Sequence, residues 1–89
     1  MKAVITVTGK DSVGIIAQVA TECANFGANI LDISQTVIQE YFNMMMIVDI
    51  SKCRKNFEDM STGLADLGTE MGLKIRCQKS EIFEKMHRV

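Results

Sequence analysis

The sequence predicts a single α+β domain in which four strands and two helices alternate along the chain. Three observations support this prediction. Three short segments alternate apolar and polar residues as half-buried strands do, and a fourth is apolar in both phases at its centre, as a more deeply buried strand is. Two longer segments repeat apolar residues every three or four positions, as amphipathic helices do. The chain has 89 residues, 47% of them apolar, which is enough for one core and too short for two domains.

The first strand is predicted over residues 2–8, where Ala3, Ile5 and Val7 share one phase. Glycine and polar residues follow at 9–12 and predict a turn. Asp11 or Ser12 is expected to cap the next helix, because a short oxygen-bearing side chain accepts a hydrogen bond from an otherwise unpaired N–H at a helix start.

The first helix is predicted over residues 13–26, because its apolar residues fall on one stripe. Gly27 supplies the left-handed residue that ends many helices. The second strand is predicted over residues 29–38. One phase of this strand holds Leu31, Ile33 and Val37, and the other holds Ile30, Asp32, Ser34 and Thr36.

The third strand is predicted over residues 41–50, and its centre at 44–48 is apolar in both phases, as in a central strand covered on both faces. The second helix is predicted to begin near Asn56, because apolar residues then recur at steps of three and four up to Gly72. Residues 73–79 alternate again and predict the fourth strand.

This β-α-β-β-α-β order predicts a ferredoxin-like domain over residues 1–79. Right-handed crossovers give the antiparallel four-stranded sheet the order 4-1-3-2, with both helices on one face. Residues 80–89 are predicted to form a short amphipathic C-terminal helix, with Ile82, Phe83 and Met86 on one side. We expect this tail to pack on the domain or on a partner subunit, because the sheet's other face lacks a helical cover.

Composition argues against several classes of protein. The formal net charge is -1 and the basic residues are scattered, so the chain lacks the positive field that nucleic acids require. The longest apolar run covers residues 44–48, far short of the roughly 18 residues of a membrane span. The strand pattern begins directly after Met1, so no leader peptide is expected and the predicted compartment is the cytoplasm.

No catalytic, metal or cofactor site is predicted. The three cysteines lack the paired spacing of zinc sites and disulfide frameworks, and Cys23 and Cys77 fall in apolar phases. His87, the single histidine, has no neighbouring acid or thiol that would make it a base. Cys53 lies between Lys52 and Arg54, which are expected to lower the pKa of its thiol and leave a redox role open.

The junction between the first strand and the first helix is the candidate binding site. Gly9 and Gly14 allow a close approach of backbone or ligand, and the helix start offers unpaired N–H groups that suit a carboxylate. Asn29 adds a donor and an acceptor at the start of the second strand. These features suit a small amino acid. A purely structural interpretation stays open, in which the glycines serve the turn and Asn29 caps the helix exit.

Two segments at this junction resemble a known family. The residues Gly-Lys-Asp-Ser-Val-Gly-Ile-Ile-Ala at 9–17 and Phe-Gly-Ala-Asn-Ile-Leu-Asp-Ile at 26–33 resemble the first half of ACT domains. The usual ACT pattern is Asp-Arg-Pro-Gly, an aliphatic helix, and then Gly-Xaa-Asn-Ile, so Ser12 and Val13 replace the common Arg-Pro. The whole chain fits, and it resembles short free-standing prokaryotic ACT proteins and the ACT halves of the glycine cleavage system repressor.

The resemblance implies a non-catalytic regulatory sensor that pairs side by side through edge strands and helices. An amino acid would bind between the subunits, and an effector protein would receive the signal. The ligand-binding positions carried over are Asp11, Ser12, Val13, Gly14, Ile15, Asn29 and Ile30, with the Asn29 side chain hydrogen-bonding the ligand. The alternatives are a protein-interaction module with a vestigial ligand cleft, an RNA-binding sheet face, which would lack an aromatic pair, and a small enzyme of the same fold.

Overall fold

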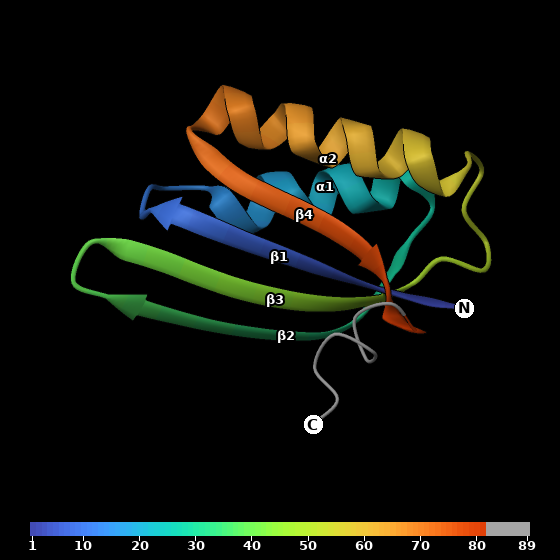
Figure 1. The fold of residues 1–89 in the computed structure, drawn as a ribbon, viewed down its shortest axis with the longest axis horizontal. Coiled ribbons are helices and arrows are strands. Elements are labelled where there is room, and N and C mark those ends of the chain that lie inside the picture. The colour runs from blue at the N-terminus through green and yellow to red at the C-terminus, as the bar shows by residue number, and fades with distance from the viewer. Residues whose placement is uncertain (82–89) are drawn as a thin grey trace.

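The computed structural model describes residues 1–81 and confirms the predicted βαββαβ fold (Figure 1). The sheet order β2-β3-β1-β4 is the predicted one, and every pair of neighbouring strands is antiparallel. The tail from residue 82 onward, with His87, lies outside the described residues. The elements are β1 (Lys2–Lys10), α1 (Ile15–Phe26), β2 (Asn29–Ile38), β3 (Tyr41–Asp49), α2 (Phe57–Met71) and β4 (Leu73–Lys79).

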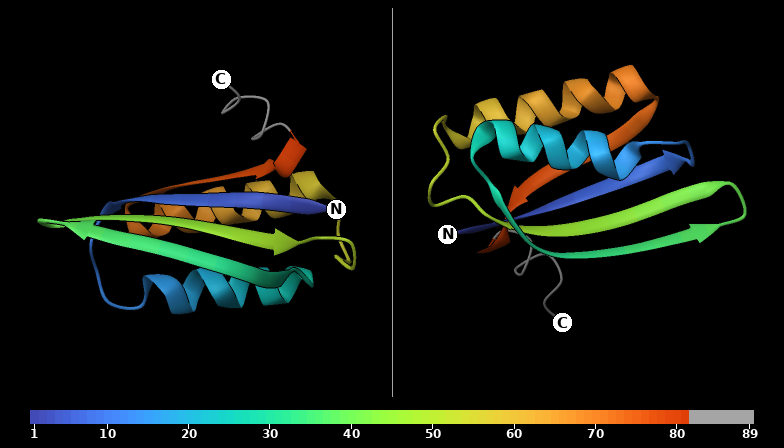
Figure 2. Two further views of the ribbon diagram at one scale, coloured as in Figure 1. Left: turned by 90° about the horizontal axis from the view of Figure 1, so that it is seen from below. Right: turned by 180° about the vertical axis from the view of Figure 1, so that it is seen from behind.

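Both α1 and α2 lie on the same side of the sheet, which leaves the opposite face without either of them (Figure 2). We call this second side the open face. The core lies between the helices and the sheet. Its large side chains with less than 2% exposure come from β1, α1, β3 and α2. They are Ile5, Val7, Val19, Cys23, Met46, Val48, Met60 and Leu64.

The strand register decides which methionines enter the core. Ile5 pairs with Met46 and Val7 pairs with Met44, so both methionines face the helices and are buried. Met45 faces the other way and is 38% exposed. The sequence had predicted a third strand covered on both faces, but neither α1 nor α2 covers the side that Met45 faces.

The start of α1 differs from the prediction. β1 continues two residues further than expected, because the backbone N–H of Asp11 donates to the Glu40 carbonyl, 2.7 Å away, at the β2–β3 turn. The helix therefore begins two residues later, and its N-cap is Gly14 at φ 88° with no side-chain cap. The predicted cap by Asp11 or Ser12 is wrong.

The second helix begins and ends as predicted. The Asn56 side chain accepts a hydrogen bond, 2.8 Å long, from the backbone N–H of Asp59. Gly72 ends α2 in the left-handed region, as Gly27 ends α1. Inside α2, Gly68 permits close packing on β4, because a Cβ at this position would lie 2.9 Å from the Leu73 carbonyl oxygen.

A β-bulge changes the predicted phases of β2. Ile30 pairs with Val48 and Ile33 pairs with Met46, so both face the helices, and Leu31 is the extra residue between them. The sequence had placed Ile30 and Ile33 in opposite phases. β2 is an edge strand, and it exposes large apolar side chains. Their exposed fractions are 47% for Leu31, 39% for Ile33, 50% for Val37 and 62% for Ile38.

Candidate functional site

A surface hollow of about 330 Å³ lies between the start of α1 and the side of β2 and β3 that faces the helices. It is at the end of the sheet where β1 stops and the β2–β3 hairpin turns (Figure 1). Its lining combines polar groups near the mouth with apolar side chains below. The lining residues are Asp11, Ser12, Gly14, Ile15, Ile16, Ala17, Gln35, Val37 and Phe42.

The first turn of α1 brings unpaired backbone donors to this hollow. The first backbone hydrogen bond of the helix runs from the Gln18 N–H to the Gly14 carbonyl, at 3.0 Å. The N–H groups of Ile15, Ile16 and Ala17 precede it and have no partner within the helix. No side chain caps this end and its first turn contains no acid, so the positive end of the helix dipole is available to an anionic group.

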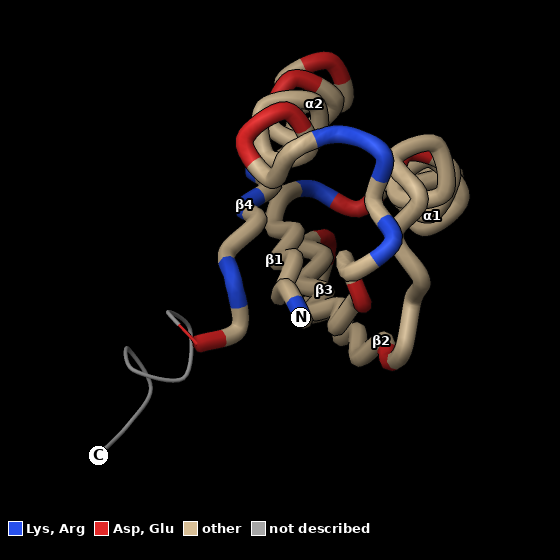
Figure 3. The backbone as a smooth tube through the Cα atoms, turned by 90° about the vertical axis from the view of Figure 1, so that its right-hand side faces the viewer, with Lys and Arg blue, Asp and Glu red and all other residues tan. Residues whose placement is uncertain are grey.

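The charged groups around the hollow are acidic. Asp11, whose side chain is exposed, lines it. The sequence contains no Lys or Arg between Lys10 and Lys52, so α1, β2 and β3 carry no basic side chain (Figure 3). The nearest cation in sequence, Lys10, lies 3.6 Å from a Glu40 carboxylate oxygen. A ligand carboxylate at this site would therefore depend on backbone N–H groups rather than on a guanidinium.

The apolar part of the lining belongs to the core itself. Ile15 is 2% exposed and Phe42 is 4% exposed, and both are members of the core cluster. Val37 lies on edge strand β2 and stays half exposed. The hollow thus has a rigid apolar base and one open side along β2.

The structure brings together four of the seven predicted ligand-binding residues, namely Asp11, Ser12, Gly14 and Ile15. Val13 does not line the hollow and is 99% exposed. Asn29 and Ile30 lie at the other end of β2, where Asn29 is about 20–26 Å along the strand from Gln35 and Val37. Within one chain Asn29 therefore does not lie beside the start of α1, and its expected place in the site is across a subunit boundary.

Five lining residues were not predicted from the sequence, namely Ile16, Ala17, Gln35, Val37 and Phe42. One signal was available, because Gln35 is a polar residue in the same phase as Ile33 and Val37. A polar side chain on the helix-facing side of a strand indicates a site or a solvent-filled edge. Phe42 lines the hollow because β3 pairs with β2, and no local sequence pattern predicts that position.

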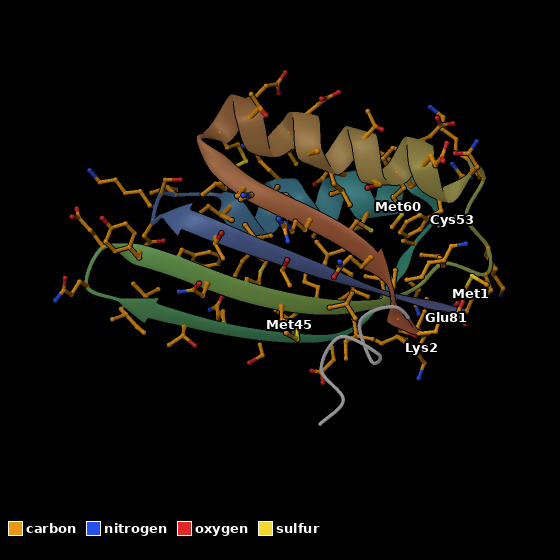
Figure 4. The ribbon with its side chains drawn as sticks, viewed as in Figure 1. Met1, Lys2, Met45, Cys53, Met60 and Glu81 are labelled. Carbon is orange, nitrogen blue, oxygen red and sulfur yellow. The ribbon has the colours of Figure 1, made fainter. Side chains whose placement is uncertain are left out.

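The thiols do not form a reactive centre. Burial raises the pKa of Cys53, and the Asp49 carboxylate raises it further, so the predicted activation by Lys52 and Arg54 is wrong. Cys53 and Met60 line a smaller hollow of about 70 Å³ near the start of α2 (Figure 4).

Burial, with a smaller effect of Glu22, raises the pKa of Cys23 to about 11, and burial raises that of Cys77 to about 12. All three cysteines are free. Within residues 1–81 no group of three His, Cys, Asp or Glu side chains could hold a metal ion. None of the helices described is long and apolar enough to cross a membrane.

A comparison with protein-family models matches residues 2–78 to the ACT domain. The chain belongs to the ACT domain family. ACT domains are regulatory ligand-binding domains. The match confirms the resemblance noted at the junction of β1 and α1, and it extends over nearly the whole described structure.

Relatives of this ACT chain include proteins of nearly the same length. A UPF0237 protein of Bifidobacterium longum is 57% identical over 88 residues, covering 99% of this chain and 98% of the relative. A UPF0237 protein of Methanocaldococcus jannaschii is 40% identical over 88 residues, with the same coverage. The expected similarity to free-standing ACT proteins is confirmed.

Solved structures agree with this assignment. An ACT domain protein from Streptococcus pneumoniae has a TM-score of 0.82 and 45% identity, over 94% of each chain. A putative glycine cleavage system transcriptional repressor has a TM-score of 0.77 and 26% identity, over 88% of this chain and 44% of that one.

Proposed function

We propose that this ACT protein is a non-catalytic regulatory domain that binds an amino acid and acts as a homodimer in the cytoplasm. The observation that carries the proposal is the uncapped start of α1, whose unpaired N–H groups border a hollow lined by an exposed acid and no cation. An effector protein would receive the signal. Three free thiols suit a reducing compartment.

The charges around the hollow favour a zwitterion. A ligand carboxylate would accept hydrogen bonds from the N–H groups of Ile15 and Ile16 at the positive end of the helix. A ligand ammonium group would pair with the exposed Asp11 carboxylate. A simple anion would be repelled by the Asp11 carboxylate and would have no positive group of its own to offset that repulsion. The apolar base at Ile15 and Phe42 leaves room for a side chain.

Dimerisation through β2 would complete the site. Edge strand β2 offers unpaired backbone groups on its outer side and four exposed apolar side chains. Two copies of β2 related by a two-fold axis would pair antiparallel, so the start of one strand would lie beside the end of the other. Asn29 of the partner subunit would then lie near Val37 and the hollow. This arrangement supports the roles assigned to Asn29 and Ile30 by resemblance.

Thermal-shift and equilibrium-dialysis measurements with the twenty amino acids test the proposal. A ligand at 100 times its dissociation constant adds about 2.7 kcal/mol to the free energy of unfolding, which raises the melting temperature of a domain of this size by about 10 °C or more. Asn29→Ala and Asp11→Asn are expected to remove the shift and to leave the dimer intact. Asn25→Ala on the exposed side of α1 is the matched control. The absence of any shift or bound amino acid contradicts the proposal.

The exposed edge of β2 also supports a second candidate, a protein-interaction module with a vestigial ligand cleft. A pull-down distinguishes the two candidates. A stoichiometric partner protein that binds equally well without any metabolite, and whose binding Asp11→Asn does not change, favours the interaction module.

A further inference from the structure

The open face carries a small apolar patch near one end of the sheet. Val4 on β1 pairs with Ile47 on β3, and Met45 lies one position further along the same side of β3. We call Val4, Met45 and Ile47 the open-face patch. Val4 is 5% exposed, yet it does not belong to the core cluster between helices and sheet. The other residues of this face in the same region are polar, including Thr6, Thr8, Ser34, Thr36 and Asn43.

The chain leaves the sheet beside this patch. β4 ends at Lys79, which pairs with Ala3, next to Val4 in β1. Ser80 and Glu81 continue with helical backbone. They line a hollow together with Met1 and Lys2, so the described part of the chain ends beside the start of β1 (Figure 4).

Residues 82–89, which lie outside the described structure, have the length and the sequence to cover the patch. Eight residues span about 12 Å as a helix and about 26 Å when extended. Adjacent strands are about 4.8 Å apart, so either form reaches from β1 to β3. Ile82, Phe83 and Met86 recur at helical spacing and give the segment one apolar side.

We propose that residues 82–89 dock on the open-face patch of their own chain, with Phe83 against Met45 and Ile47, the two side chains of the patch that remain accessible. The proposal does not depend on ligand binding at the start of α1. It also leaves edge strand β2 as the surface for association between copies.

A second copy is a poorer occupant for this patch. Three side chains provide much less than the ~800 Å² per partner that a stable protein–protein interface buries. A tethered segment needs less contact area, because the tether holds it at an effective concentration in the millimolar range. The size of the patch and the exit point of the chain therefore favour the chain's own tail.

A single fluorophore tests the docking, because the chain contains no tryptophan. We expect Phe83→Trp to give blue-shifted emission, as a buried indole does. Adding Ile47→Asp is expected to move the emission to that of a solvent-exposed indole. Thr8→Asp is the matched control, since Thr8 is on the same face of β1 but four residues from Val4. Solvent-exposed emission from the Phe83→Trp protein, or emission that Ile47→Asp leaves unchanged, overturns the proposal.

Two further measurements cover other outcomes. Phe83→Trp, Ile47→Asp chains are mixed with an excess of the original chain, and recovery of the blue-shifted emission would show docking on a partner and would contradict docking within one chain.

Trypsin cleavage after Lys85 is measured on the unlabelled protein, in case Phe83→Trp does not fold. The Ile47→Asp variant is expected to be cleaved about tenfold faster than the original chain, because a docked apolar side chain shifts the equilibrium by at least that factor. Equal cleavage rates contradict the proposal.

Discussion

Ile33→Asp is expected to break the proposed homodimer while leaving the fold intact. Ile33 lies in the middle of β2 and is 39% exposed in the single chain. The four exposed apolar side chains of β2 have about half of their surface available for burial. Complete burial of such a side chain contributes about 1.5–3 kcal/mol, so burying the exposed half contributes about 1 kcal/mol for each side chain. The eight side chains of two protomers then contribute about 8 kcal/mol to association, against an entropic cost of association of about 4–15 kcal/mol.

The substitution acts twice in a symmetric dimer. It removes about 2 kcal/mol of apolar burial, which raises the dissociation constant at least about 30-fold. It also places two carboxylates near the symmetry axis, where their repulsion adds to this loss.

Sedimentation equilibrium over a range of concentrations measures the dissociation constant directly. Ala65→Asp on the exposed side of α2 makes the same change in charge away from β2 and is expected to leave association unchanged. Thermal unfolding of the Ile33→Asp protein shows whether it folds. An Ile33→Asp protein that associates as tightly as the original chain refutes the argument for β2 pairing, and so does an original chain that remains monomeric at high concentration.

Four other predictions concern stability and thiol chemistry. Leu64→Ala in the core, where Leu64 is 0% exposed, is expected to lower the free energy of unfolding by about 2.7–5 kcal/mol in urea denaturation. Asn56→Ala is expected to cost about 1 kcal/mol in the same assay because α2 loses its cap, and Asn56→Ser is expected to retain most of it. Iodoacetamide at pH 8 is expected to modify the native protein at Cys53 alone, and mass spectrometry that finds Cys23 or Cys77 alkylated before unfolding contradicts the burial described here. Because burial raises the folded-state pKa of Cys23 to about 11, its contribution to stability is complete below pH 9 and is lost as the pH rises toward 11, which melting temperatures across that range measure.

Much of the fold could be predicted from the sequence because its signals are local. Periodicity located all six elements, and the handedness of crossovers gave the order of the strands. The start of α2 near Asn56 followed from the apolar repeat after it, and the structure shows that the Asn56 side chain caps the helix there. The bulge at Leu31 could not be predicted, because one extra residue leaves the alternating pattern intact on each side and only the pairing with β3 reveals the shift.

The candidate site was predictable only where it is contiguous in sequence. The loop before α1 forms one wall, and its residues are neighbours along the chain. Gln35 and Phe42 come from the other strands, so their positions depend on register. Asn29 begins β2 at the other end of the sheet, so one chain alone does not bring it to the hollow, and its expected role depends on a second subunit.

The use of Ile15 and Phe42 both as core residues and as the base of the hollow has an evolutionary consequence. Under the proposed function, a mutation at either residue would alter ligand preference and thermodynamic stability together, so selection would tolerate few changes there. Ser12 and Gln35 are exposed, and replacing them would carry no comparable penalty. Divergence in specificity among such domains should therefore concentrate at the rim, while the base stays nearly constant.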